Sequence, residues 1–180
     1  MRESKTKYVI LGLLAEAPLT GYEIKRIIDT RFSFFWNESY GQLYPMLRAL
    51  KDNGMIAATE GGARAQIRYA LTFAGREALV GWLAAPVETE MVRFELLLKM
   101  YFSGEAGRDA IAGHVRAFRD AHAARLATLD AFERELLPIA GRDNHADVLR
   151  VIAFGQKTYR AYLEWCDETL KYLEEKGNEA

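Results

Sequence analysis

The sequence predicts a mainly α-helical protein of two domains, residues 1–85 and 86–180. The first part shows three helical patterns, an alternating hairpin pattern and a fourth helical pattern, in that order. The second part carries apolar residues at steps of three or four along two long stretches. Pro86, within the segment APVETE, marks the boundary between the two parts.

The composition is that of an ordinary globular protein. The chain has 180 residues, of which 50% are hydrophobic and 27% charged, enough to form a core without covalent staples. The single cysteine leaves no internal disulfide, and no signal-peptide start or membrane-spanning apolar run is found, so we expect a cytoplasmic protein. Residues 1–85 hold 11 Lys and Arg against 8 Asp and Glu, whereas the remainder holds 13 against 17.

Two helices are predicted at the start. The segment YVILGLLAEA is apolar on nearly all sides, which is typical of a buried helix, and it ends before Pro18. Thr20 and Glu23 then stand at capping-box spacing, and the isoleucines of TGYEIKRIIDTRF form one stripe. The second helix is therefore amphipathic.

A third helix is predicted from Ser39, which stands at capping-box spacing from Gln42, to the left-handed end signal Asn53-Gly54. Pro45 falls where a settled helix needs a backbone N–H, so we expect bent or loosely wound first turns. On a helical wheel the core side carries Leu43, Met46, Leu47 and Leu50; the outward side carries Gln42, Pro45, Arg48, Ala49 and Asp52, with Tyr44 and Lys51 at one flank.

The segments MIAATE and IRYALT read as two strands joined by GGARAQ, a hairpin with a basic tip. A fourth helix follows in TFAGREALVGWLAA. Three helices, a hairpin and a helix form the element order of a winged helix-turn-helix, in which the third helix enters the major groove of DNA.

The second part predicts long helices. VRFELLLKMYF is apolar on nearly every side and must be buried in this chain or against another. One long helix is expected from Ser103, and another from about Ala146 to Glu175, which at 1.5 Å per residue reaches about 45 Å. We expect a second copy of the chain to cover its apolar stripe. The residues expected at this dimer contact are Leu97, Met100, Val148, Ile152, Tyr159, Tyr162, Leu163, Cys166 and Leu170.

The outward face of the third helix suits the reading of base edges. Gln pairs with adenine, Arg and Lys pair with guanine or phosphate, and small residues let the backbone approach. The candidate DNA contacts are Gln42, Tyr44, Arg48 and Lys51 in the helix, Arg64 and Arg68 in the hairpin, and Lys5 with Arg2 and Lys7 at the amino end. Plain solvated charges are the alternative interpretation for Arg48, Lys51 and Arg64.

Three stretches resemble the PadR family of bacterial transcriptional regulators: YVILGLLAEAPLTGYEIKRII, FFWNESYGQLYPMLRALKDNGMI and RYALTFAGREALVGWL. SYGQLYP and RYALTFAG are the most specific parts. The second half, from RFELLLKMYF, is similar to the longer helical C-terminal domain of one branch of that family and of related virulence activators.

The resemblance implies a homodimer, held mainly by the C-terminal helices, that binds pseudo-palindromic promoter DNA and often represses until a small molecule loosens it. It also implies DNA contacts at Ser39, Tyr40, Gln42, Tyr44 and Arg48, at Tyr22 near the second helix, and at Arg64 in the wing. The GGARAQ turn departs from the family, whose wings commonly carry more charged residues and a proline.

Other residues allow two interpretations. Trp36, Trp82, Phe154 and Tyr159 can line a pocket for a small aromatic effector where the two halves meet, or they can be core residues. The histidines lack metal-ligand spacing, so we expect neither a metal nor a cofactor. No nucleophile, base and orienting group can be nominated, so we do not expect an enzyme. The alternatives to a repressor are a transcriptional activator and a protein-interaction adaptor that uses the winged fold without an effector.

Overall fold

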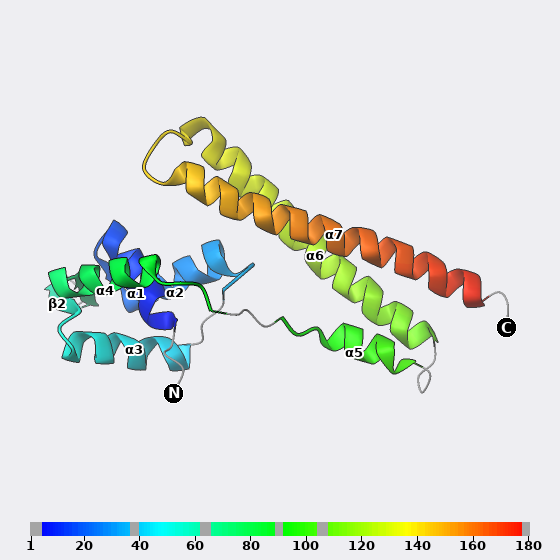
Figure 1. Cartoon of the computed structure of the whole chain (residues 1–180), viewed down its shortest axis with the longest axis horizontal. Coiled ribbons are helices and arrows are strands. Elements are labelled where there is room, and N and C mark those ends of the chain that lie inside the picture. Colours follow the sequence, from blue (N-terminus) through cyan, green and yellow to red (C-terminus); the bar gives the residue numbers. More distant parts are fainter. Residues whose placement is uncertain (1–4, 37–39, 62–65, 89–91, 104–107, 178–180) are drawn as a thin grey trace. The chain divides into compact units, whose positions relative to one another are not determined.

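The computed structural model describes residues 5–36, 40–61, 66–88, 92–103 and 108–177 (Figure 1). The chain divides into two compact units, Met1–Thr89 and Glu90–Ala180. This division falls close to Pro86, where the sequence predicts the domain boundary.

The first unit contains the expected succession of helices and a hairpin. Its elements are α1 (Thr6–Glu16), β1 (Leu19–Thr20), α2 (Gly21–Ile27), the π-helical turn η1 (Ile28–Phe32), α3 (Tyr40–Asp52), β2 (Ile56–Gly61), β3 (Gln66–Leu71) and α4 (Phe73–Ala84). The three strands form an antiparallel sheet in the order β1-β3-β2. The predicted mainly helical fold class, with a winged helix-turn-helix in the first half, is confirmed.

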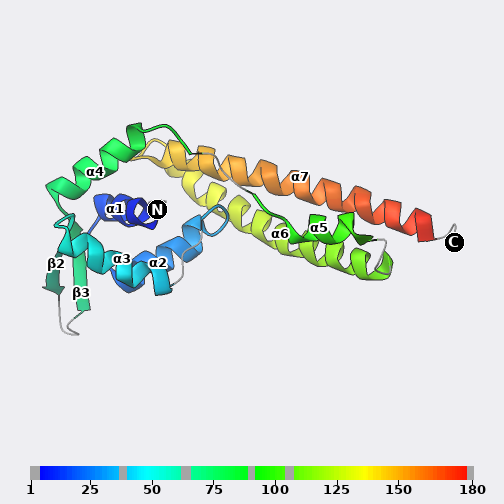
Figure 2. The ribbon, with the colours of Figure 1, turned by 60° about the horizontal axis from the view of Figure 1, so that its bottom comes forward.

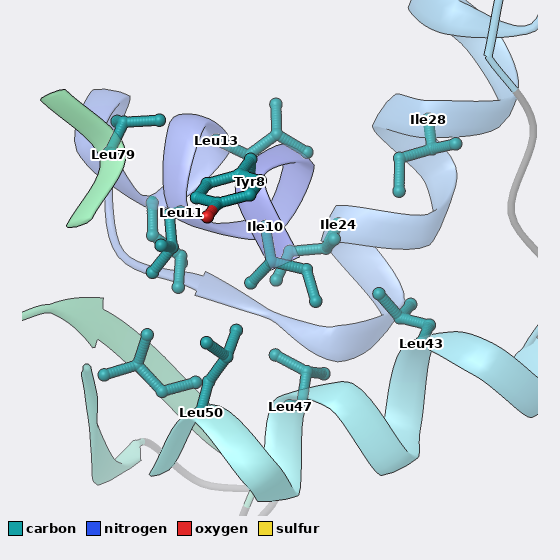
Figure 3. Close-up of a cluster of buried hydrophobic side chains, with 12 residues drawn as sticks. Tyr8, Ile10, Leu11, Leu13, Ile24, Ile28, Leu43, Leu47, Leu50 and Leu79 are labelled. Atoms are coloured by element: carbon teal, nitrogen blue, oxygen red, sulfur yellow. The ribbon is translucent and has the colours of Figure 1, made fainter. Parts of the chain in front are cut away.

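The core of this unit lies between α1 and α3. Figure 3 shows Leu43, Leu47 and Leu50 pointing from α3 toward Ile10 and Leu11 of α1, and all five side chains are no more than 2% exposed. This burial confirms the core side assigned to the third helix from its periodicity. The opposite side of α3 is consequently turned to solvent.

The end of α3 is fixed by a Schellman motif. Gly54 has a φ of 67°; its N–H donates to the Lys51 carbonyl over 2.9 Å, and the Met55 N–H donates to the Leu50 carbonyl over 2.9 Å. The Thr72 hydroxyl, which caps α4, also lies 2.9 Å from the Met55 carbonyl oxygen. The carboxyl end of α3 is thus tied to the sheet and to α4, as Asn53-Gly54 predicts.

The second unit consists of α5 (Glu95–Tyr101), α6 (Arg108–Leu136), the short 3-10 turn η3 (Leu137–Ile139) and α7 (His145–Gly177). The two long helices pack side by side in antiparallel directions (Figures 1 and 2). With 33 residues, α7 is about 50 Å long. No described helix is both long and apolar enough to cross a bilayer.

The apolar stripe of α7 is covered within the same chain. Ile152, Tyr159 and Cys166 are at most 4% exposed, and Cys166 packs against Ile111 and Val115 of α6. The expectation that these three residues form a dimer contact is therefore wrong. The expectation assumed that the rest of the domain is too short to cover α7, whereas the 29-residue α6 runs alongside it.

The remaining residues expected at the dimer contact differ in exposure. Val148, Tyr162, Leu163 and Leu170 are partly buried, and Met100 packs partly buried against the cluster around Cys166. Leu97 of α5 is 47% exposed. The prediction of a dimer is tested by none of these values, and it stays a prediction.

Candidate nucleic-acid interface

The first turn of α2 supports α3. A capping box begins α2: the Thr20 N–H donates to Glu23 Oε2 over 2.7 Å, and the Glu23 N–H donates to the Thr20 hydroxyl over 3.2 Å. A Cβ atom placed on Gly21 would lie 2.9 Å from Tyr44 Cε1 and 3.2 Å from Leu47 Cδ1. Any side chain at this position would therefore require the Tyr44 ring or the Leu47 side chain to shift.

The outward face of α3 is flat along its middle. Gly41, Pro45 and Ala49 follow one another at steps of four and are all exposed. With Tyr44, Arg48 and Asp52 they line an open hollow of about 510 Å³. All six residues belong to one helix, so the hollow is a feature of its surface that an approaching groove edge can follow.

The side chains expected to read DNA stand on or beside this face. Gln42, Tyr44, Arg48 and Lys51 are exposed, and Tyr22 of α2 is 61% exposed. Neither Arg48 nor Lys51 forms a side-chain hydrogen bond or ion pair with another described residue. Both cations are therefore available to an anionic partner such as a phosphate.

Two other candidate cations already have partners in the chain. Lys5 Nζ lies 2.8 Å from Glu88 Oε1. Arg68 donates from Nη1 to the Pro18 carbonyl over 2.7 Å and from Nη2 to Glu23 Oε1 over 3.0 Å. The sequence placed Arg68 among the DNA contacts; in the structure its guanidinium instead joins β3 to the beginning of α2. Sequence periodicity indicates exposure, but it cannot find a carboxylate that lies 45 residues away.

The carboxyl group of Glu23 is held in its charged form. The backbone N–H of Thr20 is the largest cause that lowers its pKa, and the Thr20 hydroxyl and the Arg68 guanidinium lower it further. Sequence reasoning assigned Glu23 only to the capping box and therefore missed this second partner.

Some predicted residues cannot be placed. Ser39 and Arg64 lie outside the described residues, as does the side chain of Tyr40, so the Ser39–Gln42 capping box stays a prediction. Pro45 lies inside α3, which continues through it to Asp52.

The aromatic residues expected around an effector fall in both units. Trp82 stacks on Tyr8, with ring centroids 4.6 Å apart and planes inclined by 8°, and Trp36 is partly buried. In the second unit Phe154 is 68% exposed, whereas Tyr159 is 3% exposed. Core packing thus accounts for Trp82 and Tyr159, and an effector pocket stays a prediction.

Tyr159 belongs to an aromatic cluster that joins the helices of the second unit. The His122 ring lies 3.9 Å from Phe118, 5.3 Å from Tyr159 and 5.2 Å from Tyr162. Burial lowers the pKa of His122, with Arg125 a smaller cause in the same direction and the Phe118 carbonyl opposing it. Among the described residues, no three or more His, Cys, Asp or Glu side chains gather as a metal ion would require.

An exposed third helix supported by a second helix, next to a three-stranded sheet, defines a winged helix-turn-helix protein. The model of the family described as "Transcriptional regulator PadR-like family" matches residues 10–80, and that described as "Virulence activator alpha C-term" matches residues 92–174. The first match shows that residues 10–80 form a domain of the PadR-like family of transcriptional regulators.

Individual relatives match along nearly the whole chain. The negative transcriptional regulator PadR of Bacillus subtilis is 27% identical over 177 residues, which cover 93% of this chain and 97% of that protein. The crystal structure of a PadR-like transcriptional regulator from Bacillus cereus has a TM-score of 0.80 and 29% identity, and the match covers 96% of this chain and 99% of that one. These relatives are transcriptional regulators, which are not a class of enzymes.

Two crystal structures of Bacillus subtilis PadR contain ligands. The complex with operator DNA has a TM-score of 0.81 and 26% identity, and the match covers 96% of this chain and 99% of that one. The complex with p-coumaric acid has a TM-score of 0.76 and 26% identity, with 95% and 99% covered.

Proposed function

We propose that this protein is a homodimeric, ligand-responsive repressor that reads a pseudo-palindromic promoter site with α3. The observation that carries the proposal is the solvent-facing side of α3. Gln42 can pair with adenine, and Arg48 with guanine, while Tyr44 and Lys51 reach neighbouring phosphates. The flat strip between them lets the helix backbone enter the major groove. The complex of Bacillus subtilis PadR with operator DNA supports this role for the fold.

A two-fold DNA site requires two copies of α3, the reading helix, one from each subunit of a dimer. In a dimer they would enter successive major grooves about 34–36 Å apart. We propose that a second copy covers α5 and the residue after it, whose apolar side chains are unusually exposed: Leu97 47%, Leu98 62%, Tyr101 83% and Phe102 65%. Four neighbouring exposed apolar residues are typical of a protein–protein contact. The sequence of this segment, VRFELLLKMYF, is apolar on nearly every side, which also favours a contact with a second copy.

The effector in this proposal is a small aromatic molecule. Bacillus subtilis PadR forms a complex with p-coumaric acid, and this chain carries aromatic candidates in Trp36 and Phe154. The effector would favour a dimer geometry with a different separation of the reading helices, because a ligand shifts an equilibrium only by its differential affinity for the two states.

The reading role is tested with duplexes enriched from a randomised pool by the wild-type protein. We expect Gln42→Ala and Arg48→Ala each to lose about 1–3 kcal/mol of discrimination, or roughly 5- to 150-fold in affinity at fixed salt. Arg76→Ala, which removes an exposed arginine of α4, is the matched control and should bind normally. Unchanged affinity of both α3 variants would show that another surface reads the DNA.

The dimer is tested separately by sedimentation. Wild-type protein should sediment as a dimer, and Leu98→Asp should sediment as a monomer, because a carboxylate would be buried in the contact. The same variant should lose most of its affinity for the two-fold duplex and keep weak affinity for a single half-site. A monomeric wild-type protein would contradict the dimer.

A further inference from the structure

We propose that Glu23 is a positioning residue. It fixes the wing, which is the hairpin of β2 and β3, relative to the reading helix α3 without touching DNA. The inference rests on the proposed function, since it concerns how the two DNA-facing elements are held together. Arg68 is its partner, and we infer that this arginine acts through Glu23 and not through a phosphate.

The geometry places one carboxylate between two elements. Arg68 stands opposite Thr20 in the pairing of β3 with β1. Its guanidinium reaches the Pro18 carbonyl over 2.7 Å and Glu23 Oε1 over 3.0 Å. The second oxygen of Glu23 accepts the N–H of Thr20 over 2.7 Å. The carboxylate therefore bonds the wing strand through one oxygen and the start of α2 through the other.

The backbone connection at this point is short. β1 pairs with β3 at only two positions, Leu19 with Tyr69 and Thr20 with Arg68. Two residue pairs by themselves hold β1 against β3 weakly, because even a complete two-stranded hairpin is marginally stable alone. The guanidinium bridges add charge-assisted bonds on either side of this ladder. The side-chain joint therefore adds to the packing of Ile56, Tyr69 and Leu71 against the core, because it fixes β3 against the start of α2.

The same turn of α2 also supports the reading helix. Gly21 leaves room for the Tyr44 and Leu47 side chains of α3, and Glu23, two residues later, holds β3. The wing and the reading helix thus share one support. Loss of the Glu23 joint should loosen β3 against the start of α2, while α3 keeps its own contacts with the core.

A direct phosphate role for Arg68 makes a different prediction. A lost phosphate contact lowers the slope of log affinity against log salt by about 0.9, whereas loss of a positioning contact leaves the slope unchanged. In addition, removal of Glu23 would free the guanidinium for phosphate and would not weaken binding if Arg68 were a direct contact.

The experiment uses the full chain and a duplex enriched by the wild-type protein. Glu23→Gln keeps the shape of the side chain and its acceptance from the Thr20 N–H, but it removes the charge that pairs with Arg68. We expect Glu23→Gln and Arg68→Gln each to weaken binding about fivefold, the effect of about 1 kcal/mol, with an unchanged salt slope. The double variant should be no weaker than either single variant, because both remove one joint.

Three results would overturn the proposal: normal binding by Glu23→Gln, a salt slope reduced by about one in Arg68→Gln, or a double variant whose loss is the product of the single losses. The matched control is Glu16→Gln, which removes a carboxylate of α1 that lies 3.8 Å from Arg31. It should bind as the wild type does. All variants are compared below their measured thermal transitions, so that loss of folded protein is not counted as loss of affinity.

Amide hydrogen exchange separates this inference from the proposed function. Glu23→Gln should speed exchange of the amides of β1 and β3 and leave those of α3 unchanged. If the wild-type protein enriches no duplex, the proposed function fails, and exchange alone decides whether the joint holds the wing. Unchanged exchange in β3 would reject the joint whatever the DNA result.

Discussion

Replacement of Gly21 by alanine tests how closely α2 and α3 must approach. A Cβ atom at this position would lie 2.9 Å from Tyr44 Cε1, 3.3 Å from Tyr44 Cζ and 3.2 Å from Leu47 Cδ1. Ordinary van der Waals contact begins at 3.4 Å, so the Tyr44 ring must retreat by about 0.5 Å. Leu47 is 1% exposed and has no room to move, whereas Tyr44 is 46% exposed and can rotate toward solvent.

The cost should appear in DNA binding more than in folding. Overpacking of a closed core costs about 1–3 kcal/mol, but movement of an exposed ring keeps the change in the free energy of unfolding near or below about 1 kcal/mol. In the proposed complex with DNA, a displaced Tyr44 hydroxyl would lose a hydrogen bond to a charged phosphate, about 1.5 kcal/mol or roughly tenfold in affinity. We therefore expect the added methyl group to change the affinity for DNA more than the free energy of unfolding.

The assay is a comparison of Gly21→Ala, Tyr44→Ala and the double variant by fluorescence anisotropy on the enriched duplex, with urea unfolding of each protein. The double variant should bind no more weakly than Tyr44→Ala, since both changes act on one ring. Gly12→Ala is the matched control, because a Cβ there meets nothing within 4 Å. It should stabilise α1 by about 0.5–1 kcal/mol and leave binding unchanged.

Native affinity of Gly21→Ala would refute the argument, since the ring would then have no defined role. If the loss of binding free energy in the double variant equalled the sum of the two single losses, the added methyl group would act at a site other than the Tyr44 ring. A fall of more than about 3 kcal/mol in the free energy of unfolding would show that Leu47, and not Tyr44, takes the strain.

Three further predictions concern the cores of the two units. Gln156 is 3% exposed and donates from Nε2 to Asp130 Oδ1 and to Glu133 Oε2, both over 2.8 Å. Gln156→Glu would place a third carboxylate beside these two, so it should lower the free energy of unfolding by about 2–4 kcal/mol at neutral pH. The loss should be smaller near pH 4, where carboxylates take up protons. Burial lowers the pKa of His122 below its ordinary value of 6.5, so between these two pKa values the unfolded chain binds more protons than the folded one. The free energy of unfolding of the wild type, measured by urea titration, should therefore fall as the pH drops below 6.5. His122→Phe should show a smaller fall between about pH 5 and 6.5. Leu47→Ala should cost about 2–5 kcal/mol in urea unfolding of the first unit, and a loss under about 1 kcal/mol would contradict its place in the core.

Local signals in the sequence predicted the order of elements in the first unit well. The Thr20–Glu23 spacing located the beginning of α2, Asn53-Gly54 located the end of α3, and the spacing of Leu43, Leu47 and Leu50 gave its buried side. Each of these signals depends on residues close in sequence, which periodicity and capping rules can compare. The fold class and the outward face of α3 followed from them.

What the sequence did not predict depends on distant pairing. β1 has two residues and is a strand only because β3 lies beside it, nearly fifty residues later. The η1 turn was expected as a plain continuation of α2, because i to i+5 bonding leaves no pattern that differs from a helix. The partners of Lys5 and Arg68 were invisible for the same reason, so both were assigned to DNA.

The antiparallel pairing of α6 and α7 has a consequence for biosynthesis. Ile111 and Val115 leave the ribosome before Cys166, the residue that covers them in the finished unit. Until α7 has been made, α6 presents an uncovered apolar side to the cell, and nascent chains with exposed apolar surface are prone to aggregate and to bind chaperones. Expression yield should therefore respond to changes that slow the synthesis of α7 more than to similar changes before α6.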